Sequence, residues 1–340
     1  MKQKNRWLAL GLSTVLAFAS TGCTAKQSNT ANQEDLETVS VVLDWYPNAI
    51  HAFLYAAEEL GYFAEEGLQL EIQFPANTND GISMPAAGQA DVGIYYLQDA
   101  IQAAKEQDVP ICSIGAVVQK SLNVVIAMKD SGIETAADLA GKTIGYAGTA
   151  ISEAQIASML AYEGISAEDC TCIDVGFDLL TATTTGQVDA TIGNMVNHEV
   201  PQLEEEGLEI HYFYPTDYGV PQCYELVFLA GTDAVQNNPE KLQKFLRACR
   251  KGFDYMKENP EEALQILLEH QNAENFPLSE TVERKSMEVL IPAMEMEDAP
   301  FLSQNVSVWQ ENADWMAEQG ILKEKVDVSD LVVNLLDDAQ

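Results

Sequence analysis

The stretch Leu43–Phe53 reads LDWYPNAIHAF, and it stands where a short apolar run, VSVV at 39–42, changes into a helical pattern. Asn48 is a residue type that begins helices, and Gly61 is one that ends them. Apolar residues between them recur at the spacing of one helix face, namely Ile50, Phe53, Leu54, Ala57 and Leu60. The pattern predicts a buried strand followed by a helix over Asn48–Leu60, with His51 and Tyr55 on the opposite side.

The residues between this strand and this helix are typical of a binding site for a flat ring. In open α/β sheets, ligands bind at the carboxyl ends of the strands, where Asp44–Asn48 lie. A carboxylate accepts amino hydrogens, and stacking on an aromatic side chain is worth about 1–3 kcal/mol per base in nucleic-acid complexes. We therefore take these residues as candidate ligand contacts: Asp44, Trp45, Tyr46, Asn48 and His51. The alternatives are two core rings, an Asn48 that only caps the helix, and a solvated surface histidine.

Strand and helix patterns alternate along the rest of the chain. Strand candidates are LQLEIQF (68–74), DVGIYY (91–96), ICSIGAVV (111–118), NVVIAM (123–128), KTIGYA (142–147), ATIGNM (190–195) and ELVFLAG (225–231). Helical patterns cover 151–163, 240–257 and 259–270, the last with Pro260 at its first position. This alternation predicts α/β layers with mostly parallel sheets. The ordered part, roughly 300 residues, exceeds a single typical core, so we expect two lobes.

The first residues have the pattern of a bacterial lipoprotein signal. A basic start, MKQKNRW, precedes the apolar run LALGLSTVLAFAS and the tripeptide TGC. We expect residues 1–22 to be removed and the thiol of Cys23 to carry lipid; the alternative is an ordinary signal with an incidental cysteine. Residues 23–37 are polar and predict a flexible tether. No later segment has the ~18 apolar residues of a membrane span, so we expect an extracytoplasmic protein anchored to the cell membrane.

The charge is strongly acidic. The chain carries a net charge of -35, and loss of Lys2, Lys4 and Arg6 with the signal would leave 15 basic and 53 acidic groups, or -38. Such a surface repels phosphate backbones, which argues against nucleic-acid binding. It does not identify a ligand, because a small site can differ from the average field.

Five cysteines follow Cys23, at 112, 170, 172, 223 and 249. An odd number cannot all pair within the chain, and one spacer between Cys170 and Cys172 without a nearby histidine is a poor zinc pattern. We expect no metal site, and we expect Cys112 and Cys249 to be small buried hydrophobes.

Several segments together carry a family resemblance. They are LDWYPNAIHAFLYAAEELGYFAEEGLQLEI (43–72), GQADVGI (88–94), DLAGKTIGYAG (138–148), GQVDATIG (186–193) and NNPEKLQKFLRACRKG (237–252). The chain resembles the ABC-importer binding proteins for thiamine pyrimidine precursors and the related pyrimidine synthases. The resemblance implies the type II periplasmic-binding fold, in which two α/β lobes are joined by two crossover segments and the ligand lies in the cleft. It implies a first lobe at 38–125 plus 230–340, a second at 126–229, and crossovers near SLNVVIAM (121–128) and YELVFLAG (224–231).

Other strand ends supply further candidate ligand contacts. Tyr95 and Tyr96 follow DVGI, and the alternative for them is core and surface positions in alternation. Gly148 and Thr149 precede a helix whose free N–H groups can hold a polar ligand group, or they form only a loop and cap. The remaining candidates are Asn194, Tyr224 and Glu225. A lone acid in the apolar run CYELVFLAG suits an aminopyrimidine, and the alternative is a strand residue that faces solvent.

Catalytic equipment of the related synthases is missing. Those enzymes place a lysine that binds pyridoxal phosphate, and a histidine, just after the strand that DVGI resembles, where this chain has Tyr95 and Asp99. Their cysteine-rich iron cluster corresponds to GVPQCYE, with only Cys223. We therefore expect no cofactor and no catalysis.

The sequence thus predicts a monomeric solute-binding lipoprotein that delivers a thiamine pyrimidine precursor to ABC permease subunits. The precursor would be of the hydroxymethylpyrimidine or formylaminomethylpyrimidine type. Alternatives are a binder of riboflavin, a sulfonate or another small heterocycle and, in another class, a pyrimidine-synthase-like enzyme.

Overall fold

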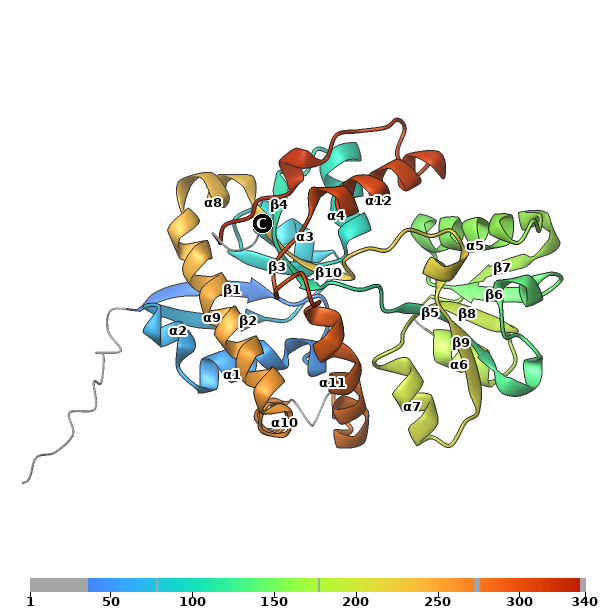
Figure 1. Cartoon of the computed structure of the whole chain (residues 1–340), viewed down its shortest axis with the longest axis horizontal. Helices are drawn as coiled ribbons and strands as arrows, with labels where there is room; N and C mark the ends of the chain where they lie inside the picture. The colour runs from blue at the N-terminus through green and yellow to red at the C-terminus, as the bar shows by residue number, and fades with distance from the viewer. Residues whose placement is uncertain (1–35, 78, 177, 272–275, 337–340) are drawn as a thin grey trace, which may run out of the picture. The chain divides into compact units, whose positions relative to one another are not determined.

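The computed structural model describes residues 36–77, 79–176, 178–271 and 276–336. Two five-stranded mixed sheets form the cores of two lobes, with the strand orders β2-β1-β3-β10-β4 and β7-β6-β8-β5-β9 (Figure 1). The expected signal, lipid-bearing Cys23 and nearly all of the tether lie outside the described residues. The fold predicted from the sequence, two α/β lobes joined by two crossover segments, is confirmed.

Lobe 1 is built on the first sheet. Its strands are β1 (Glu37–Val42), β2 (Leu68–Gln73), β3 (Val92–Tyr95), β4 (Ile111–Val118) and β10 (Leu226–Gly231). Its helices are α1 (Ala52–Glu59), α2 (Tyr62–Glu65), α3 (Asp80–Ala86), α4 (Leu97–Glu106), α8 (Thr232–Asn237), α9 (Pro239–Glu258), α10 (Pro260–Glu269), α11 (Glu280–Met294) and α12 (Val306–Glu318), with the 3-10 turns η1 (Ala49–His51) and η6 (Ser329–Leu331). β1 already starts at Glu37, which was expected to end the tether.

Lobe 2 is built on the second sheet. Its strands are β5 (Asn123–Met128), β6 (Thr143–Tyr146), β7 (Thr171–Asp174), β8 (Ala190–Met195) and β9 (Ile210–Phe213). Its helices are α5 (Ala150–Tyr162), α6 (Leu179–Thr184) and α7 (Glu199–Glu205), with the turns η2 (Lys129–Ser131), η3 (Ala136–Leu139), η4 (Ala167–Asp169) and η5 (Pro215–Tyr218).

Each sheet is mostly parallel, as expected, but contains one antiparallel strand. β1 pairs in parallel with β2 and β3, whereas β10 runs antiparallel to β3 and β4. The second sheet repeats this arrangement, with β5 antiparallel to β8 and β9. In each lobe the antiparallel strand is the one that enters directly from the other lobe. Such a strand needs no crossover helix of the kind that a parallel neighbour requires.

The chain passes between the sheets twice, through residues 119–122 and 214–225. The expected lobe boundaries at 126 and 230 fall inside β5 and β10. The segments predicted as crossovers, 121–128 and 224–231, therefore consist mainly of the strands β5 and β10. Each connecting segment lies just before its strand.

The helix after β1 differs from its prediction. Asn48 begins it and Gly61 follows it with a φ of 77°, as expected, but its first turn is the separate 3-10 turn η1. His51 and Tyr55, predicted on the polar side, are both buried, while Leu60 is exposed. α10 and α11 cover that side, since the Tyr55 ring lies 5.5 Å from the ring of His270 at the end of α10, and Glu283 of α11 accepts the Ala49 N–H. A helix packed between a sheet and another helix is apolar nearly all round.

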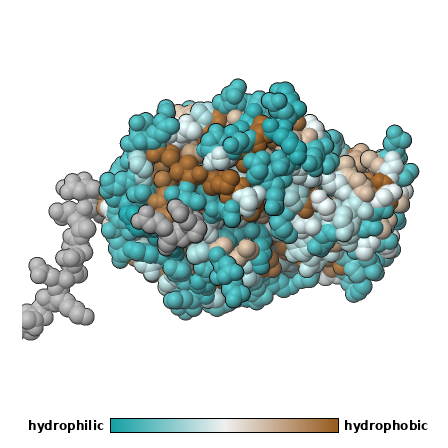
Figure 2. All heavy atoms as spheres, turned by 45° about the horizontal axis from the view of Figure 1, so that its top comes forward, coloured by the Kyte–Doolittle hydropathy of each residue, from teal (hydrophilic) through white to brown (hydrophobic). Residues whose placement is uncertain are grey.

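The surface reflects the acidic composition. Hydrophilic residues cover most of the face in Figure 2, although several large hydrophobic side chains are exposed, among them Trp45, Phe74 and Phe276. Within the described ranges, no helix combines the length and the apolar character needed to cross a bilayer.

Candidate functional site

His51 organises the loop that follows β1. Its Nε2 lies 2.8 Å from Asp44 Oδ1, and its Nδ1 accepts the backbone N–H of Asn48 at 3.3 Å. A neutral imidazole that accepts at Nδ1 carries its proton on Nε2, so His51 donates to Asp44. The imidazole is fully buried, so the surface-histidine interpretation is wrong. His51 therefore orients the carboxylate that the sequence identified first.

Asn48 is a cap, as one interpretation predicted. Its Oδ1 accepts the N–H of Ile50 at 2.9 Å, and its Nδ2 donates to the Tyr46 carbonyl oxygen at 3.1 Å. These bonds tie the loop to the first turn of η1. A contact of Asn48 or His51 with a ligand stays a prediction.

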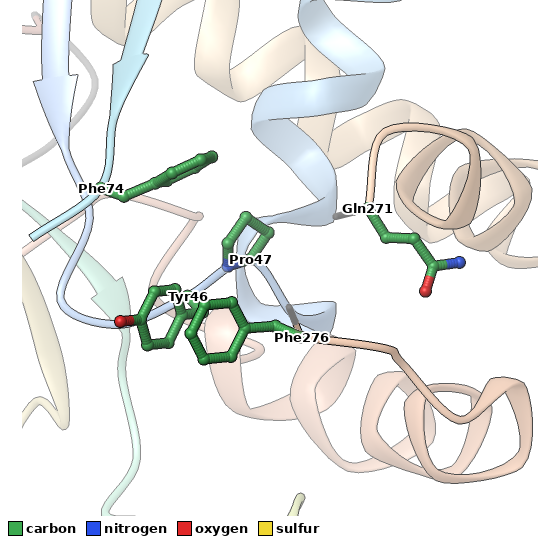
Figure 3. A pocket seen from close by; sticks show the side chains of 5 residues that line it. All are labelled: Tyr46, Pro47, Phe74, Gln271 and Phe276. Atoms are coloured by element: carbon green, nitrogen blue, oxygen red, sulfur yellow. The ribbon is translucent and has the colours of Figure 1, made fainter. Parts of the chain in front are cut away.

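The two rings of the loop differ in their surroundings. Trp45 is 49% exposed, so it is not a core residue, and its ring meets Tyr46 edge to face at 5.6 Å between centroids. Tyr46 is half-buried and stacks on Phe276, with 3.4 Å between centroids and 19° between planes. Figure 3 shows this stack beside Pro47, in a shallow pocket that Phe74 also lines. One face of Tyr46 is thus occupied by the protein itself.

Tyr95 and Tyr96 stand at the end of β3, where their rings meet edge to face at 5.2 Å. Burial raises the pKa of the Tyr96 hydroxyl well above its usual value, and the charges of Asp44, Glu225 and Asp99 raise it further. Asp44, Asp99 and Glu225 are therefore close enough to Tyr96 for their charges to act on its hydroxyl, and Asp44 and Asp99 also act on Tyr95. We call these five residues the acidic aromatic cluster.

Asp99 is a member of the cluster that the sequence did not select as a ligand contact. It lies in the first turn of α4, and burial raises the pKa of its carboxyl group to about 6. In the sequence, Asp99 is marked only by its place shortly after the strand end DVGI. That place served to compare the chain with the synthases and not to select ligand contacts.

Glu225 is buried, so the solvent-facing interpretation is wrong. Its Oε2 accepts the backbone N–H groups of Leu122 at 2.6 Å and Asn123 at 3.2 Å. Burial raises the pKa of this carboxyl group, although the two N–H groups oppose the shift. Glu225 therefore fastens one crossover to the other at the cluster.

Tyr224, the neighbouring candidate, is not brought to the cluster by any of these contacts. Its ring is buried, and its hydroxyl accepts the Asn305 backbone N–H at 2.9 Å. This contact is structural, and a ligand role for Tyr224 rests on the sequence alone.

The lobe 2 candidates make their contacts within their own lobe. Thr149 caps α5 by accepting the Ser152 N–H at 3.1 Å, which confirms the cap interpretation. Gly148 has a φ of 69° and packs against the Asp174 carboxylate. Asn194 is fully buried and donates to the Thr191 carbonyl and hydroxyl oxygens, while its own oxygen has no hydrogen-bond partner within the described part of the chain. Binding by these three residues stays a prediction.

Asn123 links the cluster to lobe 2, and the sequence gave no reason to select it. Its backbone binds Glu225, its Nδ2 donates to Gln155 Oε1 at 2.8 Å, and its Oδ1 accepts the Gly193 N–H at 3.1 Å. Gln155 lies on α5 and Gly193 on β8, which also carries Asn194. Hydrophobic periodicity identifies Asn123 only as a residue of the strand NVVIAM.

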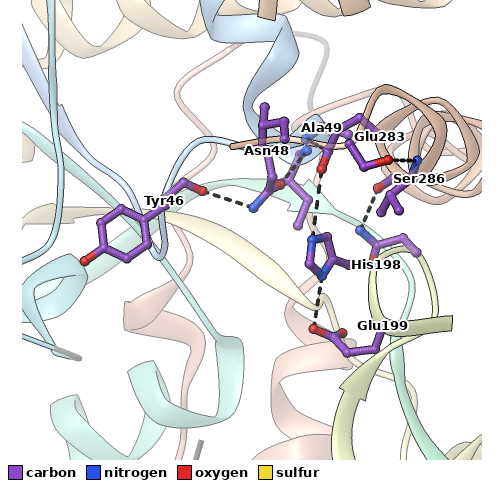
Figure 4. Close-up of polar contacts among 12 residues, drawn as sticks. Tyr46, Asn48, Ala49, His198, Glu199, Glu283 and Ser286 are labelled. Atoms are coloured by element: carbon purple, nitrogen blue, oxygen red, sulfur yellow. Dashed lines mark hydrogen bonds and ion pairs between the residues drawn. The ribbon is translucent and has the colours of Figure 1, made fainter. Parts of the chain in front are cut away.

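A second polar connection joins the lobes near η1. Figure 4 shows Glu283 of α11 between the Ala49 backbone and His198 of lobe 2. Glu283 Oε2 accepts the Ala49 N–H at 2.7 Å, and its Oε1 lies 4.0 Å from His198 Nε2. The sequence placed little weight on His198 and Glu199, because adjacent histidine and glutamate are common.

The cysteines after Cys23 are free thiols, with Cys112 and Cys249 buried as predicted. Burial raises the pKa of the Cys112 thiol to about 11. No group of three His, Cys, Asp or Glu side chains in the residues that the structure describes is arranged to hold a metal ion.

Residues 48–263 match the family model described as "NMT1/THI5 like", which covers more than half of the chain. The chain belongs to the NMT1/THI5-like family. The family resemblance that the sequence segments carry together is thereby confirmed.

Two NMT1/THI5-like relatives differ in what their names say they do. The formylaminopyrimidine-binding protein of Halalkalibacterium halodurans is 41% identical over 312 residues, which cover 92% of this chain and 94% of that protein. The 4-amino-5-hydroxymethyl-2-methylpyrimidine phosphate synthase of Aspergillus parasiticus is 28% identical over 261 residues, with coverages of 74% and 75%. The relatives of this chain thus include one named as a binding protein and one named as an enzyme.

Among solved structures, the periplasmic aliphatic sulphonate binding protein SsuA from Escherichia coli matches with a TM-score of 0.70 at 17% identity, covering 88% of this chain and 92% of that one. At this identity the match shows that the NMT1/THI5-like chain shares the periplasmic-binding fold, and nothing about its ligand.

Proposed function

We propose that this protein is an extracytoplasmic solute-binding lipoprotein of an ABC importer, and that it captures a thiamine pyrimidine precursor by lobe closure. The precursor is of the hydroxymethylpyrimidine or formylaminomethylpyrimidine type. The acidic aromatic cluster is the observation that carries the proposal.

The chemistry of this cluster suits an aminopyrimidine. Ionised carboxylates are pure hydrogen-bond acceptors, which pair with exocyclic amino groups and with a protonated ring nitrogen. Tyr95 and Tyr96 offer ring faces and edges beside them, and Trp45, which neighbours Asp44 in the chain, is a further exposed ring. A flat ring rich in N–H groups uses both features at once.

Lobe closure supplies the selectivity. The cluster lies at the carboxyl ends of β1 and β3, and both crossovers meet at Glu225. A hinge of a few connecting residues permits one lobe to rotate toward the other. Closure removes water from the ligand, so that a few hydrogen bonds decide which ring is retained.

Lipid on Cys23 would tether the protein to the cell membrane, with residues up to about Asp35 as the leash. The closed form is then the form that the permease subunits recognise. Support for this part comes from the sequence pattern and the family, and metabolic labelling with a radioactive fatty acid tests it: wild type should be labelled and Cys23→Ala should not.

The other ligands are less well matched to the cluster. Three acids repel a sulfonate or a phosphate, whereas riboflavin and other uncharged heterocycles meet no such penalty. An enzyme of the synthase class is the alternative from another class, because the family includes synthases at 28% identity.

Incubation of the purified protein with hydroxymethylpyrimidine or formylaminomethylpyrimidine distinguishes these functions. We expect an increase in melting temperature, and mass spectrometry should recover the pyrimidine unchanged. Conversion of the pyrimidine would overturn the binding function as the sole role, and stabilisation by sulfonates alone would overturn the ligand class.

A further inference from the structure

One buried carboxylate contacts both lobe 2 and the loop of Asp44. Glu283 lies on α11 with its side chain only 1% exposed. One of its oxygens accepts the Ala49 N–H at 2.7 Å, and the other faces His198 Nε2 at 4.0 Å. A helix cap needs a single oxygen, so the second oxygen is available for lobe 2.

The Ala49 contact leads directly to the candidate ligand site. Ala49 opens η1 and follows Asn48, whose backbone N–H is held by His51. His51 in turn donates to Asp44 at 2.8 Å. Glu283 is therefore connected to the Asp44 carboxylate through its contact with Ala49, the peptide link to Asn48 and the two hydrogen bonds of His51.

The His198 contact leads into lobe 2. His198 lies between β8 and α7, with its Nδ1 3.1 Å from Glu199 Oε1. Beside it, Asn197 donates to Ser286 of α11 at 3.0 Å, and both of these side chains are buried. Farther out, the exposed pair Lys285–Glu204 spans the same lobes at 2.8 Å.

The buried and the exposed contacts between the lobes should differ in how much they contribute to stability. An exposed pair such as Lys285–Glu204 contributes little, because solvent screens its charges. Removing one partner of a buried pair has a larger effect, because it leaves the other group desolvated and unpaired. Glu283 and its partners are thus the part of the lobe contact to which the site responds.

We propose that Glu283 is a positioning residue that couples the contact between the lobes to the geometry of the Asp44 loop. Loss of the His198 contact then loosens residues 48–51, although they lie in the other lobe. The consequence for ligand affinity rests on the proposed function, whereas the coupling itself is measurable without any ligand.

The charges around this contact give it a pH window. Burial lowers the pKa of His198, but its hydrogen bond to the Glu199 carboxylate and the charges of Glu199 and Glu283 raise it above its usual 6.5 overall. Burial raises the pKa of Glu283, and the Ala49 N–H, His198 and His51 oppose that shift. The ion pair exists only between the two pKa values. It is lost in acid when Glu283 is protonated, and in base when His198 is neutral.

Residue-resolved amide hydrogen exchange on the ligand-free full chain tests the coupling. In His198→Gln we expect the amides of 48–51 to exchange at least about threefold faster than in wild type. Glu283→Gln keeps an oxygen for the Ala49 N–H and should loosen Asn197–Glu199 more than Ala49, whereas Glu283→Ala should loosen both. Lys285→Gln is the matched control on the same face and should change neither.

Unchanged exchange at 48–51 in His198→Gln, in a variant with wild-type circular dichroism, would overturn the coupling. If that variant does not fold, loosening of Asn197–Glu199 in Glu283→Gln with unchanged exchange at 48–51 would overturn it instead. Wild-type protection factors at 48–51, which correct for the pH dependence of intrinsic exchange, should also be largest inside the pH window, and protection that does not change with pH contradicts the proposal. If no pyrimidine binds the wild type, the proposed function fails while these exchange results keep their meaning.

Discussion

The ligand-facing edges of the two lobes are built differently. In lobe 1, Asp44 is oriented by His51 and lies with Tyr95, Tyr96 and further acids in one cluster. In lobe 2, Thr149 and Asn194 use their polar groups within their own lobe. Under the proposed function, lobe 1 would recognise the ring, and lobe 2 would mainly exclude water when it closes.

Replacement of Asp44 should reveal the largest difference between the lobes in their contribution to pyrimidine affinity. Asp44→Asn keeps an oxygen for the His51 N–H but removes the charge, so we expect on the order of 100-fold weaker pyrimidine binding, about 2.7 kcal/mol. Titration calorimetry measures the affinity. In lobe 2, Thr149→Ala should lose about 1 kcal/mol of folding stability from its cap and leave the affinity within about threefold. Equal losses of affinity in both variants would mean that recognition is shared between the lobes.

Truncation of Trp45 should have the next largest effect on binding. Loss of its stacking surface in Trp45→Ala should weaken binding by about 10-fold to 100-fold, or 1–3 kcal/mol. Because the side chain is 49% exposed, the urea midpoint of unfolding should stay close to that of wild type. Wild-type affinity in this variant would place the ring outside the site.

A smaller effect, on stability, tests the packing of the lobe 2 loop. Gly148→Ala places a Cβ 2.6 Å from the Asp174 carboxylate at a φ of 69°, and a left-handed non-glycine residue costs about 1–2 kcal/mol. Gly186→Ala is the matched control, with a φ of 70° and nothing within 4 Å. Urea unfolding should show the larger loss for Gly148→Ala; equal losses would show that the Asp174 contact adds nothing.

The smallest effect concerns Asp99 and depends on pH. Its folded-state pKa of about 6 exceeds its usual 3.8. The folded state therefore binds the proton more tightly, and stability falls as pH rises between these values. Asp99→Asn removes that loss, so it should be more stable than wild type at pH 7, with the advantage reduced at pH 3.5. A stability difference that is independent of pH, measured by urea unfolding, would contradict the burial of this carboxyl group.

The sequence predicted much of the fold, because apolar runs and caps are local signals. β4, β5 and β8 have the predicted bounds. β7 was missed because TCID is largely exposed at a sheet edge and lacks an apolar pattern. The burial of His51 was also missed, because it depends on α11, which packs on η1 and lies about 230 residues later in the chain.

The site was predicted less completely, for a related reason. Asp44, Tyr95 and Tyr96 stand directly after strands, where a sequence pattern points to a ligand edge. Asn123 and Glu283 act through partners more than 60 residues away, Gly193 and Ala49. No local pattern marks such residues, and only the tertiary structure brings them to the site.

Titration calorimetry of the purified protein with formylaminomethylpyrimidine tests the central claim most directly. The account predicts one molecule bound per chain with a micromolar or lower dissociation constant, ~8 kcal/mol or more, and loss of the binding heat in Asp44→Asn. Absence of binding at millimolar pyrimidine, or equal affinity in Asp44→Asn, would contradict it.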